Sequence, residues 1–109
     1  MTLTSFFQCS KDEFYVKLIS AAQGFQIKSG ISATLILTVV EEKHEFGLVK
    51  MTITNKAFGD LAGEAQCAYY EENGGVKCTT TINLTLSYKL GFWPRKIRRG
   101  FEDMFQQIK

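Results

Sequence analysis

The single histidine of the chain has neighbours that could support acid–base chemistry. His44 lies in the stretch EKHE, flanked by Glu42 and Glu45. An imidazole beside carboxylates can serve as a general base near neutral pH. The sequence places neither a nucleophile nor an acid beside this histidine, so we favour the interpretation that it is an exposed turn residue. The sequence therefore predicts no catalytic residue.

Other motifs that carry chemistry are missing from the sequence. It contains no phosphate-binding glycine loop, no nucleophile elbow and no HExxH motif. The chain has three cysteines, Cys9, Cys67 and Cys78, which is an odd number, and none of them is in a CxxC motif. Together with the single histidine they do not make up a zinc site of the usual geometry. We expect no metal, no cofactor and reduced cysteines that act as small core residues.

Tyr69 is a candidate for anchoring a ligand. It stands at the end of an apolar segment that finishes with Glu71 and Glu72, and its hydroxyl could give one polar contact to an otherwise apolar ligand. A core tyrosine whose hydroxyl reaches the rim is the favoured interpretation. A cyclase-like or hydrolase-like enzyme would need Tyr69 to converge with Glu71 or His44 inside a pocket.

Basic residues concentrate near the C-terminus, at Lys89, Arg95, Lys96, Arg98 and Arg99. On a helix, Arg98 pairs with Glu102 and Arg99 with Asp103, four positions later. Lys89, Arg95 and Lys96 are the remaining candidates for binding an anion or a partner. The helix dipole opposes cations in a first helical turn, so Arg95 and Lys96 cost stability there, which indicates either a binding role or a nearby acidic side chain.

Two binding modes for this basic segment are disfavoured. Nucleic-acid binding would need exposed aromatic residues among the basic ones, whereas here the aromatic residues share one arc of the helix. Binding to a membrane surface would insert Trp93, Phe101 and Phe105, and this competes with burial of the same side chains in the core.

The chain length sets the size of the fold. A chain of 109 residues, 45% apolar and 22% charged, predicts one globular domain over residues 1–109. The N-terminus lacks a basic segment followed by a long apolar run, so we expect neither a signal peptide nor a spanning helix. The expected location is the cytoplasm.

Residue periodicity predicts the elements. A strand is expected over 2–9, followed by a helix that begins at the capping box Ser10–Glu13 and ends near Gly24. The polar stretch QIKSG is expected to connect this helix to the first of four further strands, which cover 31–41, 46–57, 61–72 and 76–89. The Asn73-Gly74 turn pairs Glu72 with Gly75, which sets the register of the last two strands.

The chain is expected to close with an amphipathic helix. Pro94 suits its first turn. Its apolar arc consists of Trp93, Ile97, Phe101, Met104, Phe105 and Ile108. The order is β-α-β4-α, an α+β fold in which two helices cover one face of an antiparallel sheet.

This order, with the segment SKDEFYVKLI after the first strand and basic residues ahead of the final aromatic stripe, resembles the small bacterial proteins of domain-of-unknown-function family 3284. Those proteins are similar to the START-like, or SRPBCC, helix-grip superfamily. The resemblance implies a curved antiparallel sheet around the C-terminal helix, with an apolar ligand cavity between them. Helix-grip proteins usually have more strands than the sequence predicts here, which indicates a truncated version, and the superfamily shares no catalytic residues.

The leading functional hypothesis is therefore a non-enzymatic module that binds an apolar small molecule or lipid between the sheet and the C-terminal helix. The expected lining is Leu35, Tyr69, Leu84, Phe101 and Phe105. The alternative is a module that recognises a protein partner through its surface, as inhibitors and immunity proteins of phages and mobile elements do. The sequence does not predict an oligomeric state.

Overall fold

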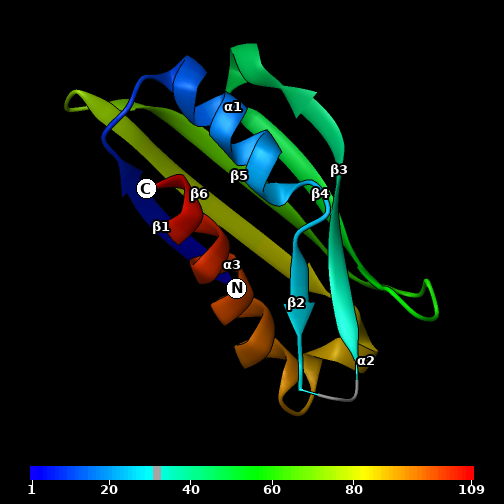
Figure 1. The fold of residues 1–109 in the computed structure, drawn as a ribbon. Helices are drawn as coiled ribbons and strands as arrows, with labels where there is room; N and C mark the ends of the chain where they lie inside the picture. Colours follow the sequence, from blue (N-terminus) through cyan, green and yellow to red (C-terminus); the bar gives the residue numbers. More distant parts are fainter. Residues whose placement is uncertain (31–32) are drawn as a thin grey trace.

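The computed structural model describes residues 1–30 and 33–109. Its elements, in chain order, are β1 (Thr2–Phe7), α1 (Lys11–Ala22), β2 (Gln26–Lys28), β3 (Thr34–Lys43), the 3-10 turn η1 (His44–Phe46), β4 (Leu48–Asn55), β5 (Leu61–Glu72), β6 (Gly75–Leu84), α2 (Leu86–Lys89) and α3 (Trp93–Ile108). The strands form one antiparallel six-stranded sheet in the order β1-β6-β5-β4-β3-β2. Figure 1 shows α1 and α3 on the same face of this curved sheet.

The β5–β6 hairpin has the register that its turn predicts. Asn73 and Gly74 both have positive φ, at 51° and 79°, which a two-residue turn between twisted strands requires. The predicted pairs are confirmed: Glu72 with Gly75, Cys67 with Thr80, and Tyr69 with Cys78. Cys67 and Cys78 are free thiols, as expected, and both contact the Thr80 hydroxyl.

Both predicted helices are confirmed. The backbone N–H of Glu13 donates to Ser10 Oγ at 3.1 Å, which caps α1, while the Glu13 carboxylate pairs with Lys17 instead of returning to Ser10. α3 buries the predicted apolar arc, except for Trp93, which is half-buried. Its polar face is exposed, and Arg98 pairs with Glu102 there, whereas no ion pair forms between Arg99 and Asp103.

Two segments differ from the predicted elements. Residues 26–28, expected to lie in a polar connection, form the edge strand β2, in which Ile27 is buried and pairs with Leu35. The strand expected over 76–89 ends at Leu84, because the next four residues turn into α2. The alternation of apolar residues continues through Leu86 and Tyr88, but Leu86 is exposed while Tyr88 is buried.

The boundaries of the remaining strands shift by a few residues. β1 ends at Phe7 instead of residue 9, β4 covers 48–55 instead of 46–57, and β3 continues to Lys43. The first two residues of the strand predicted over 31–41 lie outside the described residues. These shifts leave the inward and outward faces as predicted, with Leu3 and Phe7 buried and Phe6 exposed.

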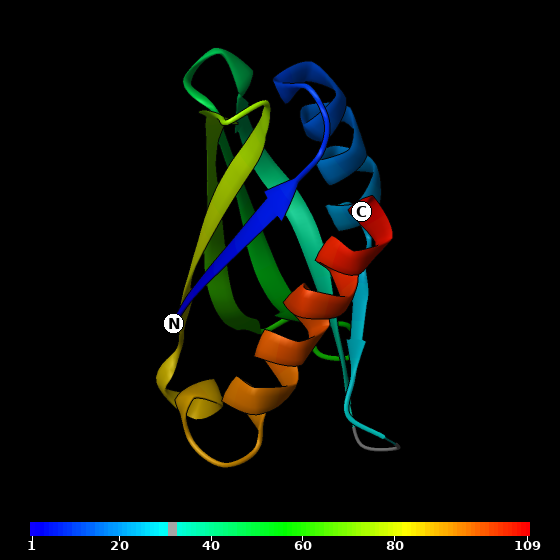
Figure 2. The same cartoon turned by 90° about the vertical axis from the view of Figure 1, so that its left-hand side faces the viewer.

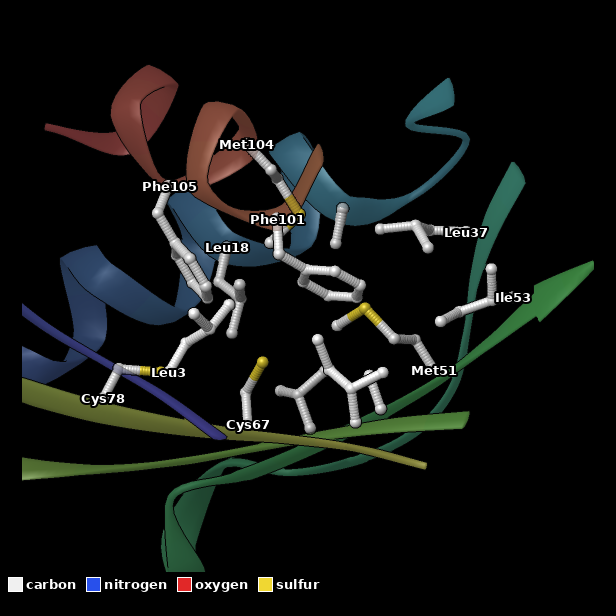
Figure 3. Close-up of a cluster of buried hydrophobic side chains, with 14 of the residues drawn as sticks. Leu3, Leu18, Leu37, Met51, Ile53, Cys67, Cys78, Phe101, Met104 and Phe105 are labelled. Carbon is white, nitrogen blue, oxygen red and sulfur yellow. The ribbon is translucent and has the colours of Figure 1, made fainter. Parts of the chain in front are cut away.

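The two helices cover the concave face of the sheet. In Figure 2, the sheet curves around α3, which runs from α2 at one end of the molecule toward the C-terminus near β1. The core lies between these layers, and Figure 3 shows Phe101 and Phe105 of α3 directed toward the sheet. In residues 1–30 and 33–109, no helix is long and apolar enough to span a bilayer.

Candidate functional site

α3 is attached to the rest of the fold by apolar packing. Phe101 and Met104 are fully buried, and the Phe105 ring lies 5.8 Å from that of Phe7. Within the described residues, no hydrogen bond or ion pair joins α3 to the sheet or to α1. An apolar molecule could therefore replace contacts of α3 without leaving a polar group unpaired.

One contact of α3 is unusually close. A Cβ at Gly100 would lie 2.6 Å from Cγ1 of Ile27, so only glycine lets the helix approach β2 to this distance. Gly100 is therefore the position at which α3 packs against the edge strand β2. This contact could not be predicted from the sequence, because β2 was not predicted.

The residues predicted to line a ligand cavity do not form one compact cluster. Leu35 and Leu84 lie at the α2 end of the sheet, where Leu84 pairs with Gly63. Tyr69 pairs with Cys78, six residues earlier on β6, which places it about 20 Å from Leu84. Phe101 and Phe105 lie on α3 over the sheet, and both are buried. A ligand under α3 would contact only part of this set.

Grooves border α3 on the outside, and two of them lie between the middle of the helix and the edges of the sheet. The larger, of about 520 Å³, separates α3 from β1 and is lined by Ser5, Arg99, Glu102, Asp103, Phe105, Gln106 and Lys109. The smaller, of about 270 Å³, separates α3 from β2 and includes Ile27 and Gly100. The two grooves follow the two sides of α3 where it packs on the sheet. Phe105 lines the larger groove and Ile27 the smaller one, and both are apolar core residues.

His44 is not the exposed turn residue that the sequence predicted. Its Nε2 lies 2.6 Å from Oδ1 of Asp12 at the start of α1, and its Nδ1 lies 2.8 Å from the hydroxyl of Tyr69 on β5. The Tyr15 ring stacks on the imidazole at 4.3 Å, and the Tyr15 hydroxyl donates to Glu42. The structure therefore brings His44 and Tyr69 together, as the enzyme hypothesis required, and adds Asp12.

The hydrogen-bonded series Asp12–His44–Tyr69 extends from solvent into the core. The Asp12 side chain is 91% exposed, the His44 side chain 30%, and Tyr69 only 2%. Burial raises the pKa of Tyr69, so its phenol stays protonated and can donate to His44. No described groove includes these three residues, and the inner end of the chain packs on Phe14 at 5.1 Å. These two hydrogen bonds connect α1, η1 and β5 at one end of the molecule.

We expect Tyr69→Phe to lower the free energy of unfolding at pH 7 by about 1 kcal/mol, because it leaves His44 Nδ1 without its partner. Tyr70→Phe, on the exposed side of the same strand, is the matched control and should change stability by less than about 0.5 kcal/mol. Urea denaturation of both variants measures the difference.

The same pair of variants tests the pKa of Tyr69. Because burial raises this pKa above the ordinary value of about 10, the protonated phenol stabilises the fold below that pH, and this contribution is lost as pH rises further. Tyr69→Phe lacks the contribution, so the stability gap between wild type and variant should narrow above about pH 10. A gap that stays constant would show that Tyr69 ionises as freely in the fold as in the unfolded chain.

The three basic candidates lie close together at the α2 end. Lys89 closes α2 instead of a strand, and Arg95 and Lys96 occupy the first turn of α3, where no acidic residue stands. All three are exposed, and none forms an ion pair with a described residue. Phe101 and Phe105 are buried in the core, the arrangement that the sequence favoured over their insertion into a membrane surface.

The described residues contain no group of three or more His, Cys, Asp or Glu side chains placed to hold a metal ion. Asp12 and His44 are the closest approach to one, and their third neighbour is the Tyr69 hydroxyl. The series Asp12–His44–Tyr69 is therefore a hydrogen-bonded contact between α1, η1 and β5.

Comparison with solved structures shows what the arrangement is similar to. DynU16, from the dynemicin biosynthetic locus, aligns with a TM-score of 0.70 and 10% identity over 99% of this chain and 45% of its own. Ara h 8.0201 aligns with a TM-score of 0.64 and 12% identity, over 99% and 92% of the two chains. An uncharacterised protein from Bacillus thuringiensis aligns with a TM-score of 0.60 and 10% identity, over 99% and 94%. The chain has the helix-grip fold.

The helix-grip assignment confirms the predicted fold class, a curved antiparallel sheet packed on a C-terminal helix. This chain spans less than half the length of DynU16, the first of these structures. No family model matches the sequence, and no curated protein matches it. At these identities the similarity is one of fold.

Proposed function

We propose that this helix-grip protein binds an apolar small molecule or lipid between α3 and the concave face of its sheet. The attachment of α3 by apolar packing supports the proposal most directly. Displacing α3 costs contacts that an apolar ligand can restore, and it breaks no hydrogen bond or ion pair among the described residues. Phe101 and Phe105 are the residues whose sheet contacts the ligand would replace.

The composition of the interior also supports ligand binding. Met51 and Met104 lie near the Phe101 ring in Figure 3, and Cys67 and Cys78 are buried in the same core cluster. Methionine side chains are unbranched and polarizable, so they repack around shapes of different sizes. The two grooves beside α3 each include one apolar core residue, Phe105 in the larger groove and Ile27 in the smaller one.

A disulfide between α3 and β2 tests the proposal. Ile27 and Gly100 are close enough for a cysteine pair, and the three atoms nearest to an ideal Cβ at Gly100 all belong to the Ile27 side chain, which the second cysteine replaces. The variant I27C/G100C, made in a Cys9→Ser background, should take up the uncharged apolar dye Nile red when reduced. When oxidised, its affinity should fall at least tenfold, because α3 is then fixed to the sheet.

The Cys9→Ser parent protein, with and without oxidant, is the control for effects of oxidation alone. Native mass spectrometry of the purified wild-type protein provides a second measurement, since a tightly held apolar molecule would add to its mass. Equal uptake by the oxidised and reduced I27C/G100C variant, or no uptake by either, would overturn the proposal.

Two finer predictions go with this function. Membership of domain-of-unknown-function family 3284 stays a prediction, because it rests on the segment SKDEFYVKLI and the order of elements. A reducing compartment such as the cytoplasm is the expected location, since all three cysteines are free thiols. Recognition of a protein partner is the alternative function, and the I27C/G100C experiment separates it from ligand binding.

A further inference from the structure

The end of the molecule formed by α2 and the start of α3 carries exposed apolar side chains. Leu86 is 74% exposed, Leu90 70% and Phe92 52%, and they lie within a segment of seven residues. The Trp93 ring, beside Phe92 at 4.9 Å, is half-buried against Tyr88. Apolar side chains of this size, clustered on one protruding end, are typical of an interaction surface.

The same end carries cations that lack partners. Lys89, Arg95 and Lys96 alternate with the apolar residues along the chain, and no described residue forms an ion pair with them. Arg95 and Lys96 also lie at the positive end of the α3 dipole, where a cation lowers the stability of the helix. An external anion would give these cations a partner and would offset the repulsion from the helix dipole.

Charge is distributed unequally along the 41 Å long axis of the molecule. The end opposite α2, formed by the start of α1, η1 and the β5–β6 hairpin, is shown in Figure 1. Acidic residues gather there, at Asp12, Glu13, Glu42, Glu45, Glu71 and Glu72, and they outnumber the lysines among them, Lys11, Lys43 and Lys77. A negatively charged surface would therefore attract the α2 end more strongly than the other end, which favours one orientation of approach.

We propose that the α2–α3 surface, which consists of Leu86, Lys89, Leu90, Phe92, Arg95 and Lys96, docks on an anionic lipid bilayer. Its leucine and phenylalanine tips enter the interface while the basic residues meet the headgroups, and Trp93 lies at the same level. A nucleic acid would use the cations but not Leu86 or Leu90. A protein partner would need a complementary shape, whereas a bilayer needs only apolar side chains flanked by cations at one end of the molecule, where Figure 2 shows α2 and the start of α3. Docking does not depend on ligand binding under α3.

Vesicle binding tests the proposal with the full chain. Vesicles of phosphatidylcholine alone are compared with vesicles in which about one-third of the lipid is phosphatidylserine. Co-sedimentation measures affinity, and Trp93, the single tryptophan, reports contact through a blue shift of its fluorescence. We expect binding to the anionic vesicles, a much weaker binding to the neutral ones, and loss of binding as salt rises above about 0.1 M.

Two variants of the surface, each with a matched control, locate the docking site. K89Q/R95Q/K96Q should lose affinity on the order of 100-fold, since each basic residue near an anionic bilayer contributes about fivefold. Its matched control, K17Q/K43Q/K50Q, removes the same charge from residues that pair with Glu13 and Glu41, and should bind nearly as well as wild type. L86S/L90S should lose about tenfold or more, whereas Phe46→Ser, an equally exposed residue at the far end, should lose nothing.

Several outcomes would overturn the proposal. The first two are a lack of vesicle binding and equal binding to neutral and anionic vesicles. The third is an equal loss of affinity in K89Q/R95Q/K96Q and K17Q/K43Q/K50Q, which would mean that only the net charge of the protein matters. Binding to a DNA duplex without binding to vesicles would assign the surface to nucleic acid instead. The oxidised I27C/G100C variant should still dock, so a failure of ligand uptake and a failure of docking can be told apart.

Discussion

Replacing Phe101 with alanine is expected to lower the free energy of unfolding by about 3–5 kcal/mol. Phe101 is fully buried at the centre of the layer between α3 and the sheet, where Figure 3 shows its ring above Met51. The truncation removes apolar contacts and leaves a cavity that rigid neighbours fill only in part. Since domains of this size are stable by about 5–15 kcal/mol, the variant should lose a large fraction of its stability.

Phe58→Ala is the control, because Phe58 is 85% exposed in the β4–β5 connection. It should change stability by less than about 0.5 kcal/mol. Denaturant unfolding followed by circular dichroism measures both variants. A small effect of Phe101→Ala would mean that α3 does not pack on the sheet as described, and the proposed binding layer would lose its basis.

Gly47→Ala is expected to destabilise the fold by roughly 3 kcal/mol or more. Gly47 follows η1 with a φ of 65°, and a Cβ there would lie 2.0 Å from the backbone oxygen of Tyr69. The left-handed conformation costs alanine about 1–2 kcal/mol, and the clash with backbone adds to it. Relief of the clash requires β5 to move away, which breaks the hydrogen bond from Tyr69 N to Gly47 O.

Gly74→Ala separates the two costs. Gly74 has a similar φ of 79°, but an added Cβ there meets nothing within 4 Å. Its substitution should therefore cost only the conformational part, about 1–2 kcal/mol. Thermal and urea unfolding of the two variants give the comparison. Equal losses would show that the close approach of Gly47 to Tyr69 does not exist in solution.

The features that the sequence predicts well are those set by local chemistry. The Asn73-Gly74 turn fixes the β5–β6 register by itself, because only certain residues adopt its dihedral angles. The apolar arc of α3 follows from helical spacing, and its buried residues are the predicted ones. In both cases the information lies within a few consecutive residues.

The features that the sequence misses depend on tertiary contacts. β2 is a strand because Ile27 pairs with Leu35 and supports Gly100, and neither contact is visible in the stretch QIKSG. α2 imitates a strand, since Leu86 and Tyr88 continue the alternation of β6. The Tyr88 hydroxyl donates to Asp60, a contact from the β4–β5 connection that stabilises the turn.

The candidate sites divide in the same way. Arg95 and Lys96 could be selected from the sequence because their cost in a first helical turn is a local property, and Lys89 could be selected because no acidic residue follows it at helical spacing. The approach of Asp12, His44 and Tyr69 required the fold, since these residues come from α1, η1 and β5. The capping box did place Asp12 at an exposed helix start, but nothing in the sequence pointed it at a histidine.

The pairing of β1 with β6 has a consequence for how the chain reaches its native state. Phe7 lies opposite Val76, so this pair closes a loop of about 70 residues, whereas the β5–β6 hairpin closes a loop of two. Loop closure of that length costs conformational entropy before any contact returns it, so we expect the hairpins to form early and β1 to join late. During synthesis, the first strand must then wait for β6 to leave the ribosome, and the edge of β6 that it later covers stays unpaired until that time.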